Sequence, residues 1–314
     1  MGRAGADGGD GAEPAAPEFD PAFTVTEPAV LTRALVLSSP HSGRIYPARF
    51  LRSARLDPAS LRRSEDAFVD ELFEPAVSLG LPLLRAHFPR AYLDLNREPY
   101  ELDPRMFDGR LPAYVNTRSV RVAGGLGTIA RVVGDSQEIY AKRLPVEEGL
   151  RRIDQLHKPY HAALQDLLHR AIRRFGVAVL LDCHSMPSSS VTGSADPATW
   201  RDERTKADVV LGDRYGTSCD RAFVDAAEGA LRRFGYAVER NKPYAGGFIT
   251  EHYGRPAAGC HALQIEINRG LYMDERALAR GPDFHALSRH LVAVVAAVSE
   301  VASGAGGLER VAAE

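Results

Sequence analysis

The chain has 314 residues, of which 45% are hydrophobic, and its 39 basic and 41 acidic residues leave a formal net charge of −2. This length allows a sizeable core in one large α/β domain or two smaller ones, and the near-balanced charge offers no basic field for nucleic acid or an anionic membrane. Three cysteines without paired spacing, Cys183, Cys219 and Cys260, indicate a reducing compartment, so we expect a cytoplasmic protein.

Both ends of the chain are rich in small and polar residues. Residues 1–22 contain Gly, Ala, Pro and acids but lack the basic and apolar regions of a signal peptide, so we expect a disordered tail. Residues 304–314 predict a second loose terminus. Residues 23–303 between them predict a single domain, in which we find no apolar run long enough to cross a bilayer.

Strand and helix patterns alternate through this domain, because short apolar runs predict strands and apolar residues at near-helical spacing predict helices. In chain order we expect a strand at 34–38, a helix at 58–79, strands at 81–84 and 91–95, a helix at 145–174, strands at 177–182 and 208–212, a helix at 218–234, strands at 236–239 and 261–267, and a helix at 283–302. The glycine-rich residues 100–135 predict an elaborated loop or small hairpin over the sheet edge. The alternation predicts an α/β fold with a mixed, mostly parallel central sheet flanked by helices.

Two of the predicted strands lead to histidines beside small polar residues. The run at 34–38 is followed by His41, and the run at 177–182 is followed by His184. Because the carboxyl ends of parallel strands share the edge where open α/β sheets keep their ligand sites, we expect the two imidazoles to share a metal. Imidazole nitrogens with a carboxylate oxygen suit one zinc ion that keeps an open position.

The third ligand has two candidates within the predicted helix at 58–79. Asp66 and Asp70 lie four residues apart and share a helix face, although acidic pairs at this spacing also merely solvate exposed surfaces. We favour Asp66 because it lies nearer the mouth of the first strand. Asp182, two residues before His184 on the same strand face, is expected to orient that histidine.

Glu266 interrupts the apolar run at 261–267, where a charged group requires a partner or a function. We predict that it is the general base of a hydrolytic reaction, with a buried ion pair to Arg269 as the alternative.

Four further side chains are predicted to contact substrate. Asn96 and Arg97 end the predicted strand at 91–95 and form a candidate carboxylate clamp, because guanidinium offers a planar fork to two oxygens. Arg90, just before that strand, is placed to polarise a scissile carbonyl. His252 follows a glycine-rich turn and is a candidate substrate contact on a mobile loop.

Some reactive residues fit structural roles better. His157, His161 and His169 belong to the predicted helix at 145–174, with no catalytic acid between them, so we expect them to be structural. Cys183 neighbours His184, but successive side chains of a strand point to opposite faces, which is a poor geometry for joint catalysis.

Several segments together resemble the N-formylglutamate amidohydrolase family over about residues 35–300. They are Ser-Pro-His-Ser-Gly at 39–43, Asp66, Asp-Leu-Asn-Arg at 94–97, Asp-Cys-His-Ser at 182–185, Gly-Gly-Phe-Ile-Thr at 246–250 and Gln-Ile-Glu-Ile at 264–267. The resemblance implies a fold related to zinc carboxypeptidases and aspartoacylases, with a mixed sheet of eight strands and a single zinc at its carboxyl edge. The carboxypeptidase His-x-x-Glu pair is absent, because Arg44 stands three residues after His41, so the acidic ligand comes from elsewhere.

By the same resemblance, Asn96 and Arg97 bind a substrate carboxylate, Arg90 polarises the carbonyl and Glu266 is the general acid and base. We therefore predict a zinc-dependent amidohydrolase acting on a small N-formyl or other N-acyl amino acid, with N-formyl-L-glutamate first, and no nucleic-acid or membrane partner. The alternatives are a metal-dependent peptidase or deacylase acting on a larger acyl or cell-wall substrate, and a non-catalytic module that binds acidic metabolites. No oligomeric state is predicted.

Overall fold

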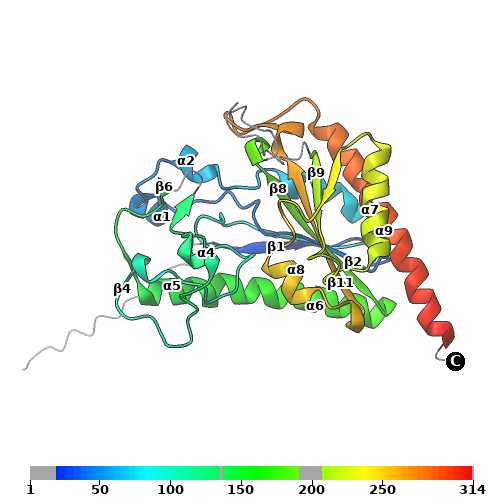
Figure 1. The fold of residues 1–314 in the computed structure, drawn as a ribbon, viewed down its shortest axis with the longest axis horizontal. Coiled ribbons are helices and arrows are strands. Elements are labelled where there is room, and N and C mark those ends of the chain that lie inside the picture. Colours follow the sequence, from blue (N-terminus) through cyan, green and yellow to red (C-terminus); the bar gives the residue numbers. More distant parts are fainter. Residues whose placement is uncertain (1–18, 134–136, 191–206, 313–314) are drawn as a thin grey trace, which may run out of the picture.

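The fold is a central sheet covered by helices on both faces, as Figure 1 shows for this computed structural model. The structure describes residues 19–133, 137–190 and 207–312. Within these ranges the central sheet has seven strands, in the order β1-β3-β2-β8-β11-β9-β10. Their bounds are β1 Phe23–Thr26, β2 Leu35–Ser39, β3 Leu83–Ala86, β8 Ala178–Met186, β9 Val209–Gly212, β10 Val238–Arg240 and β11 Cys260–Asn268.

The sheet is mixed but mostly parallel. Strands β3, β2, β8 and β11 run parallel to one another, and so do β9 and β10, whereas β1 is antiparallel to β3 and β9 is antiparallel to β11. The predicted fold class is therefore confirmed, although the described sheet has seven strands where the family resemblance implied eight.

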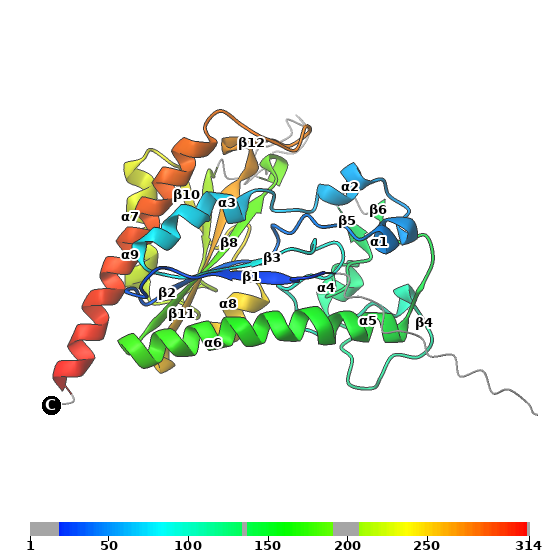
Figure 2. The same cartoon turned by 180° about the vertical axis from the view of Figure 1, so that it is seen from behind.

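Helices cover the two faces of the sheet, and shorter elements form a lobe beside it (Figures 1 and 2). The helices are α1 Ala48–Ser53, α2 Pro58–Arg62, α3 Val69–Phe73, α4 Val120–Ala123, α5 Val146–Arg152, α6 Lys158–Phe175, α7 Arg221–Arg233, α8 Phe248–Tyr253 and α9 Phe284–Ala312. Two-stranded ladders join β4 Phe107–Asp108 to β7 Leu144–Pro145, β5 Val132–Val133 to β6 Gln137–Glu138, and β12 Met273–Asp274 to β13 Ala279–Arg280. The short β5–β6 hairpin begins inside the region where a small hairpin was expected.

Successive side chains along the strands point to opposite faces of the sheet and so belong to two different hydrophobic cores. Leu180 of β8 faces the core that contains α6 residues, whereas Leu181 faces the core built with α7 and α9. Because side chains of a strand alternate between faces, the residues at positions 182 and 184 continue the α6 face toward the carboxyl end of β8. Strand β11 repeats the pattern, with Ala262 in the α6 core and Leu263 in the other. Polar side chains at the carboxyl ends of both strands therefore share one face.

Two predicted elements were wrong, and both lie beside the site. The helix expected at 58–79 is split into α2, α3 and a 3₁₀ helix at Glu74–Leu79, so residues 63–68 lie outside any helix. The strand expected at 91–95 is a turn and loop. Asp66 and Asp70 consequently do not share one continuous helix.

The chain ends also differ from expectation. Residues 1–18 of the predicted tail lie outside the described residues, whereas the Phe19 ring packs at 5.6 Å from the Phe88 ring and 5.4 Å from the Tyr92 ring. At the other end, α9 continues to Ala312 where a loose terminus was expected from residue 304.

Contrary to our expectation, α9 contains a segment, Phe284–Gly304, that is long and apolar enough to cross a membrane by length and composition. In the fold this helix buries Leu287, Leu291 and Val294 in a core and packs against α7 and α3. A buried apolar stripe against neighbouring helices is the pattern of a core helix.

Candidate active site

The carboxyl ends of β2 and β8 bring His41 and His184 together. The two strands are parallel neighbours with Ser38 opposite Asp182. His41 follows two residues after the end of β2, and His184 lies near the end of β8 on its α6 face. Both side chains are buried, and their ring centroids are 4.8 Å apart.

Asp66 reaches this edge from the break between α2 and α3. Its backbone N–H donates to the carbonyl of His41 at 3.0 Å, which ties the break to the loop after β2. Phe68 follows with φ 65°, a left-handed conformation that is strained for a bulky residue, and α3 begins directly after it. Arg269 donates to Asp66 Oδ1 at 3.0 Å and leaves Oδ2 facing the histidines.

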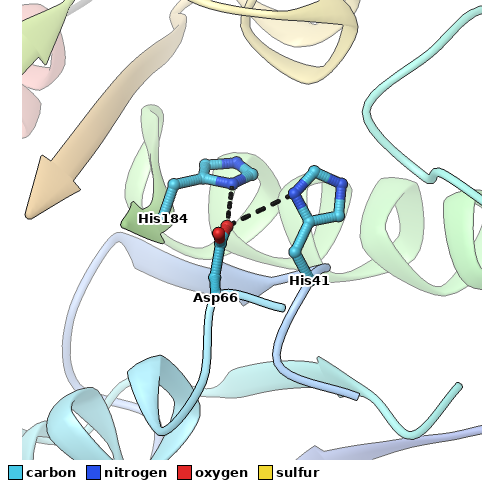
Figure 3. Close-up of side chains that lie close together, drawn as sticks. All are labelled: His41, Asp66 and His184. Atoms are coloured by element: carbon cyan, nitrogen blue, oxygen red, sulfur yellow. Dashed lines mark hydrogen bonds and ion pairs between the residues drawn. The ribbon is translucent and has the colours of Figure 1, made fainter. Parts of the chain in front are cut away.

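Figure 3 shows the three side chains converging through one carboxylate oxygen. Asp66 Oδ2 lies 3.0 Å from His184 Nδ1 and 3.4 Å from His41 Nδ1. One potential ligand atom from each residue falls within 4.8 Å of the others, and all three residues are buried. Asp70, the alternative ligand, is not part of this group; its backbone N–H donates to Ser42.

A carboxylate stands behind each histidine. His41 Nε2 lies 2.7 Å from Asp94 Oδ1, and His184 Nε2 lies 2.9 Å from Asp182 Oδ2. Acceptors at Nε2 favour the tautomer with the proton there, which turns both Nδ1 lone pairs toward Asp66. His41 Nδ1 is buried without a hydrogen-bond partner.

Three acceptors that face one another require a positive charge between them, either a proton or a metal ion. The same demand shows in the pKa of His184, which burial lowers but the carboxylates of Asp182 and Asp66 raise well above its ordinary value. Two imidazole nitrogens and one carboxylate oxygen, with carboxylates behind both rings, form a donor set that fits zinc.

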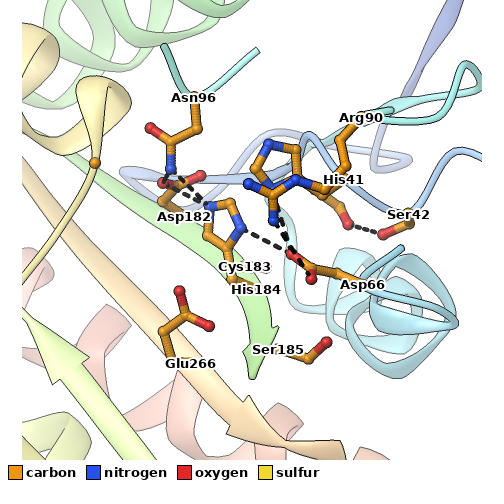
Figure 4. Close-up of polar contacts among 12 residues, drawn as sticks. His41, Ser42, Asp66, Arg90, Asn96, Asp182, Cys183, His184, Ser185 and Glu266 are labelled. Atoms are coloured by element: carbon orange, nitrogen blue, oxygen red, sulfur yellow. Dashed lines mark hydrogen bonds and ion pairs between the residues drawn. The ribbon is translucent and has the colours of Figure 1, made fainter. Parts of the chain in front are cut away.

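The first residue of the predicted clamp, Asn96, bonds within the protein. Asn96 uses its amide inside the protein: Nδ2 donates to Asp182 Oδ2 at 3.3 Å, and Oδ1 accepts from Ile249 N–H at 2.8 Å. Figure 4 shows this amide against Asp182 and His184. Asn96 is therefore linked through Asp182 to the back of His184, and it lines the cavity described below.

Glu266 lies on β11 directly opposite His184 of β8. One of its carboxylate oxygens accepts from Gln264 Nε2 at 2.8 Å. Arg269, the expected alternative partner, is instead committed to Asp66 and Ser185. Burial raises the pKa of Glu266 from 4.5 to about 7, which suits a group that accepts and returns a proton near neutrality.

A cavity of about 610 Å³ opens onto these groups. Its lining includes His41, His184 and Glu266 together with Arg90 and Arg97. Arg90 donates to Asp94 Oδ2 at 2.8 Å and lies 4.0 Å from Asp66. The site therefore combines a buried acidic centre with guanidinium groups on its wall.

His252 is placed differently from the other predicted residues. It lies on helix α8 rather than on a loop, and its ring stacks at 5.0 Å on Phe248. It lines a second cavity of about 820 Å³ together with His157 and His161. The structure thus does not bring His252 into the cavity that contains His41 and His184.

The sequence analysis did not predict the supporting roles of three residues. Asp94 holds His41, Arg269 fixes Asp66, and Gln264 joins Glu266 to the backbone N–H of Gly247. Asp94 and Gln264 stood inside motifs that we had singled out, so their spacing within those motifs was the available signal. Arg269 comes directly after β11, at the same edge of the sheet as His41 and His184.

Comparison with known proteins gives consistent matches. Residues 33–273 match the sequence profile of the family described as N-formylglutamate amidohydrolase. The N-formylglutamate deformylase of Pseudomonas aeruginosa is 31% identical over 247 residues, which cover 77% of this chain and 83% of that protein. The Pseudomonas putida enzyme of the same name is 29% identical over 77% of this chain and 82% of its own length.

Solved structures agree with these matches. The crystal structure of N-formylglutamate amidohydrolase from Ralstonia eutropha JMP134 is similar to this chain with a TM-score of 0.81 and 39% identity, over 90% of this chain and 97% of that one. An Agrobacterium tumefaciens protein with 16% identity shares the fold with a TM-score of 0.58, over 89% of this chain and 96% of its own.

Proposed function

This chain belongs to the N-formylglutamate amidohydrolase family, and on that premise we propose that it is a zinc-dependent enzyme that hydrolyses N-formyl-L-glutamate to formate and L-glutamate. Family membership makes the chain a hydrolase of amide bonds and sets aside the non-catalytic binding module. The substrate, the metal and the roles of individual residues are the parts that we propose.

The observation that carries the proposal is the convergence of His41, Asp66 and His184 beside Glu266. A purely structural histidine cluster has no need for two ring nitrogens aimed at one carboxylate oxygen, with a further carboxylate behind each ring. It also has no need for a buried glutamate on the adjacent strand that lacks an arginine partner at hydrogen-bond distance among the described residues.

We assign His41, Asp66 and His184 as the zinc ligands, because their donor atoms and burial fit that ion. A zinc ion held there would supply Lewis acidity, which polarises an amide carbonyl and lowers the pKa of water. Asp94 and Asp182 orient the two imidazoles, and Arg269 holds Asp66 in place through the oxygen that faces away from the histidines.

Glu266 moves the proton in this scheme. The attacking water forms a bond to the formyl carbon and gives one proton to the Glu266 carboxylate. Glu266 then donates that proton to the amide nitrogen as the carbon–nitrogen bond breaks, which gives formic acid and the free amine. The remaining acid proton passes to the amine, so that formate and the protonated amine leave. The hydrogen bond from Gln264 fixes one carboxylate oxygen and leaves the other free for this transfer.

Two arginines complete the assignment. Arg90 donates to Asp94 and lies 4.0 Å from Asp66, a position beside the proposed zinc ligands that supports its assignment to the formyl oxygen, where negative charge develops. Arg97 lines the cavity and is assigned to a substrate carboxylate. This assignment keeps the predicted role of Arg97 but replaces the clamp with a single arginine, since Asn96 is engaged elsewhere.

The proposal is tested by formate release from N-formyl-L-glutamate, using chelator-stripped protein with and without added zinc. N-formyl and N-acetyl derivatives of neutral amino acids are measured in parallel. We expect zinc-dependent release that favours the glutamate compound. Cleavage restricted to larger acyl donors would instead support a deacylase, and zinc-independent turnover would remove the metal assignment.

Glu266→Gln separates proton transfer from metal binding. The variant keeps the size and the hydrogen-bonding capacity of the side chain but cannot accept the proton. We expect normal zinc stoichiometry and a decrease in kcat of roughly 10²-fold or more, measured by formate release at saturating substrate. A near-normal kcat would exclude Glu266 as the general base.

A further inference from the structure

The guanidinium of Arg121, on the cavity wall, has no place in the proposed mechanism. Arg121 belongs to α4 and lines the same cavity as Arg97. Among the described residues its ion-pair partner is Glu101, at a distance of 3.7 Å, which is longer than a hydrogen bond. A cation on a cavity wall with so weak a partner is available to an anionic ligand.

The backbone holds Arg121 and Arg97 in a fixed relation. Arg97 Nε donates to the carbonyl of Leu126 at 2.9 Å, and the N–H of Leu126 donates to the carbonyl of Arg121 at 2.8 Å. Gly127 follows in this turn, where a Cβ atom would meet the carbonyl oxygen of Glu101 at 2.2 Å. The turn is therefore closely packed, and it holds the guanidinium of Arg97 and the backbone of Arg121.

The wall carries more positive than negative charge. Arg90 holds Asp94 at 2.8 Å, and Arg97 approaches the same carboxylate only to 3.9 Å, so one aspartate serves two cations. Burial lowers the pKa of Arg97, and the guanidinium groups of Arg90 and Arg121 lower it further, although the carboxylates of Asp94 and Glu101 oppose this shift. Mutual repulsion of this kind is relieved when anions bind between the cations.

We propose that Arg121 binds the side-chain carboxylate of the substrate while Arg97 holds its α-carboxylate. The α-carboxylate is attached to the carbon that bears the scissile amide, which assigns it to Arg97, the arginine that borders Asp94 and hence His41. The second carboxylate of glutamate lies two methylene groups farther away, toward α4. This inference rests on the proposed function and makes Arg121 the residue that selects an acidic amino acid.

The test compares N-formyl-L-glutamate with its neutral isostere N-formyl-L-glutamine. In Arg121→Met, we expect the ratio of kcat/KM for the glutamate donor to that for the glutamine donor to fall on the order of 10- to 100-fold, the range of a charge-assisted hydrogen bond. The loss should appear mainly in KM, because the distal carboxylate does not react. Arg121→Lys should retain most of the preference.

Arg118→Met is the matched control, because it removes an exposed arginine just before α4 that does not line the cavity. We expect it to leave the ratio unchanged. If Arg121→Met keeps the glutamate preference, or Arg118→Met loses it equally, the inference is wrong. A wild-type enzyme with no glutamate preference would instead remove the proposed substrate and this inference with it, so the two failures are distinguishable.

Product binding gives a second readout that does not depend on turnover. Calorimetric titration of the zinc-loaded protein with L-glutamate and with L-glutamine should show a preference for L-glutamate that Arg121→Met abolishes. Equal loss of affinity for both amino acids would indicate a general defect of the cavity and would overturn the selective role of Arg121.

Discussion

Two pairs of histidines in this protein differ in what faces their rings. His41 and His184 meet at the sheet edge, where carboxylates lie at their Nε2 atoms and their Nδ1 atoms converge on Asp66. His157 and His161 stack at 4.2 Å where α6 begins, with ring nitrogens 2.9 Å from backbone carbonyl oxygens.

The groups that contact the ring therefore decide whether a histidine has a chemical or a structural role. Charged acceptors around His184 raise its pKa despite burial, so that site demands a cation. Neutral carbonyls around the helix pair do not offset burial, which lowers the pKa of His157 to about 4 and that of His161 to about 3. The helix pair therefore stays uncharged and braces the loop that carries Asn96, through the carbonyls of Leu95 and Arg97.

Among the variants proposed to test this difference, we expect His184→Ala to lose the most zinc binding and activity. The variant removes one of three proposed zinc ligands from a buried site, so zinc binding and turnover should be lost together. We expect kcat/KM for formate release to fall by about 10³-fold or more, the scale of several kcal/mol of metal-ion catalysis. Zinc stoichiometry is measured on the same preparation.

His169→Ala is the control for that experiment, since it removes an exposed histidine from α6. It should keep both zinc and activity. Full zinc occupancy in His184→Ala would contradict the ligand assignment, and the two histidine pairs would then no longer differ in the way that we describe.

Asp182→Asn tests the carboxylate behind His184. The amide keeps the shape of the side chain but removes the charge that orients and polarises the imidazole through Nε2. We expect the zinc affinity to fall about 10- to 100-fold, as is usual when such an outer partner of a metal-bound histidine is removed. Competition with a chromophoric chelator measures the change.

Asp70→Asn provides the matched comparison, because Asp70 is also a buried aspartate near this edge but contacts no histidine in the described structure. Its zinc affinity should equal that of the wild type. An equal loss in both variants would mean that total negative charge, rather than the contact with His184, controls the affinity.

The sheet and its two histidines could be predicted because their signals are local. Apolar runs identified β2, β8 and β11, and the parallel arrangement then placed His41 and His184 at one edge. The alternation of side chains along β8 likewise gave Asp182 the same face as His184.

The polar network around the histidines could not be predicted in the same way, because contacts between distant segments determine it. Asp66 was chosen as a residue of a helix, whereas its backbone is held in a break by His41 and its side chain by Arg269. Asn96 stands in a motif typical of a carboxylate clamp, yet bonds to Asp182 and Ile249 use its amide. Sequence pattern predicts which residue types gather, but the partners of each polar atom follow from tertiary packing.

The dependence of protein stability on pH tests whether the helix pair is neutral. Burial and the nearby positive charges of His252 and Lys158 lower the pKa of His157, while its bond to the Arg97 carbonyl and the charge of Asp94 raise it, and burial prevails. The folded protein therefore keeps this ring neutral down to about pH 4, whereas the unfolded chain binds a proton near pH 6.5. The stabilisation is complete above pH 6.5 and is lost as the pH falls toward 4.

His157→Gln measures that contribution, because glutamine can still donate to the Arg97 carbonyl but does not titrate. Between pH 6.5 and pH 4.5, the free energy of unfolding of the wild type should fall more steeply than that of the variant, by about 1.4 kcal/mol per pH unit. Denaturant titrations of chelator-stripped protein give both slopes, and the exposed His169→Gln should keep the wild-type slope. Equal slopes for the wild type and His157→Gln would show that the ring is protonated in the folded state. Carbonyl partners alone would then not explain why only one pair is arranged for a metal.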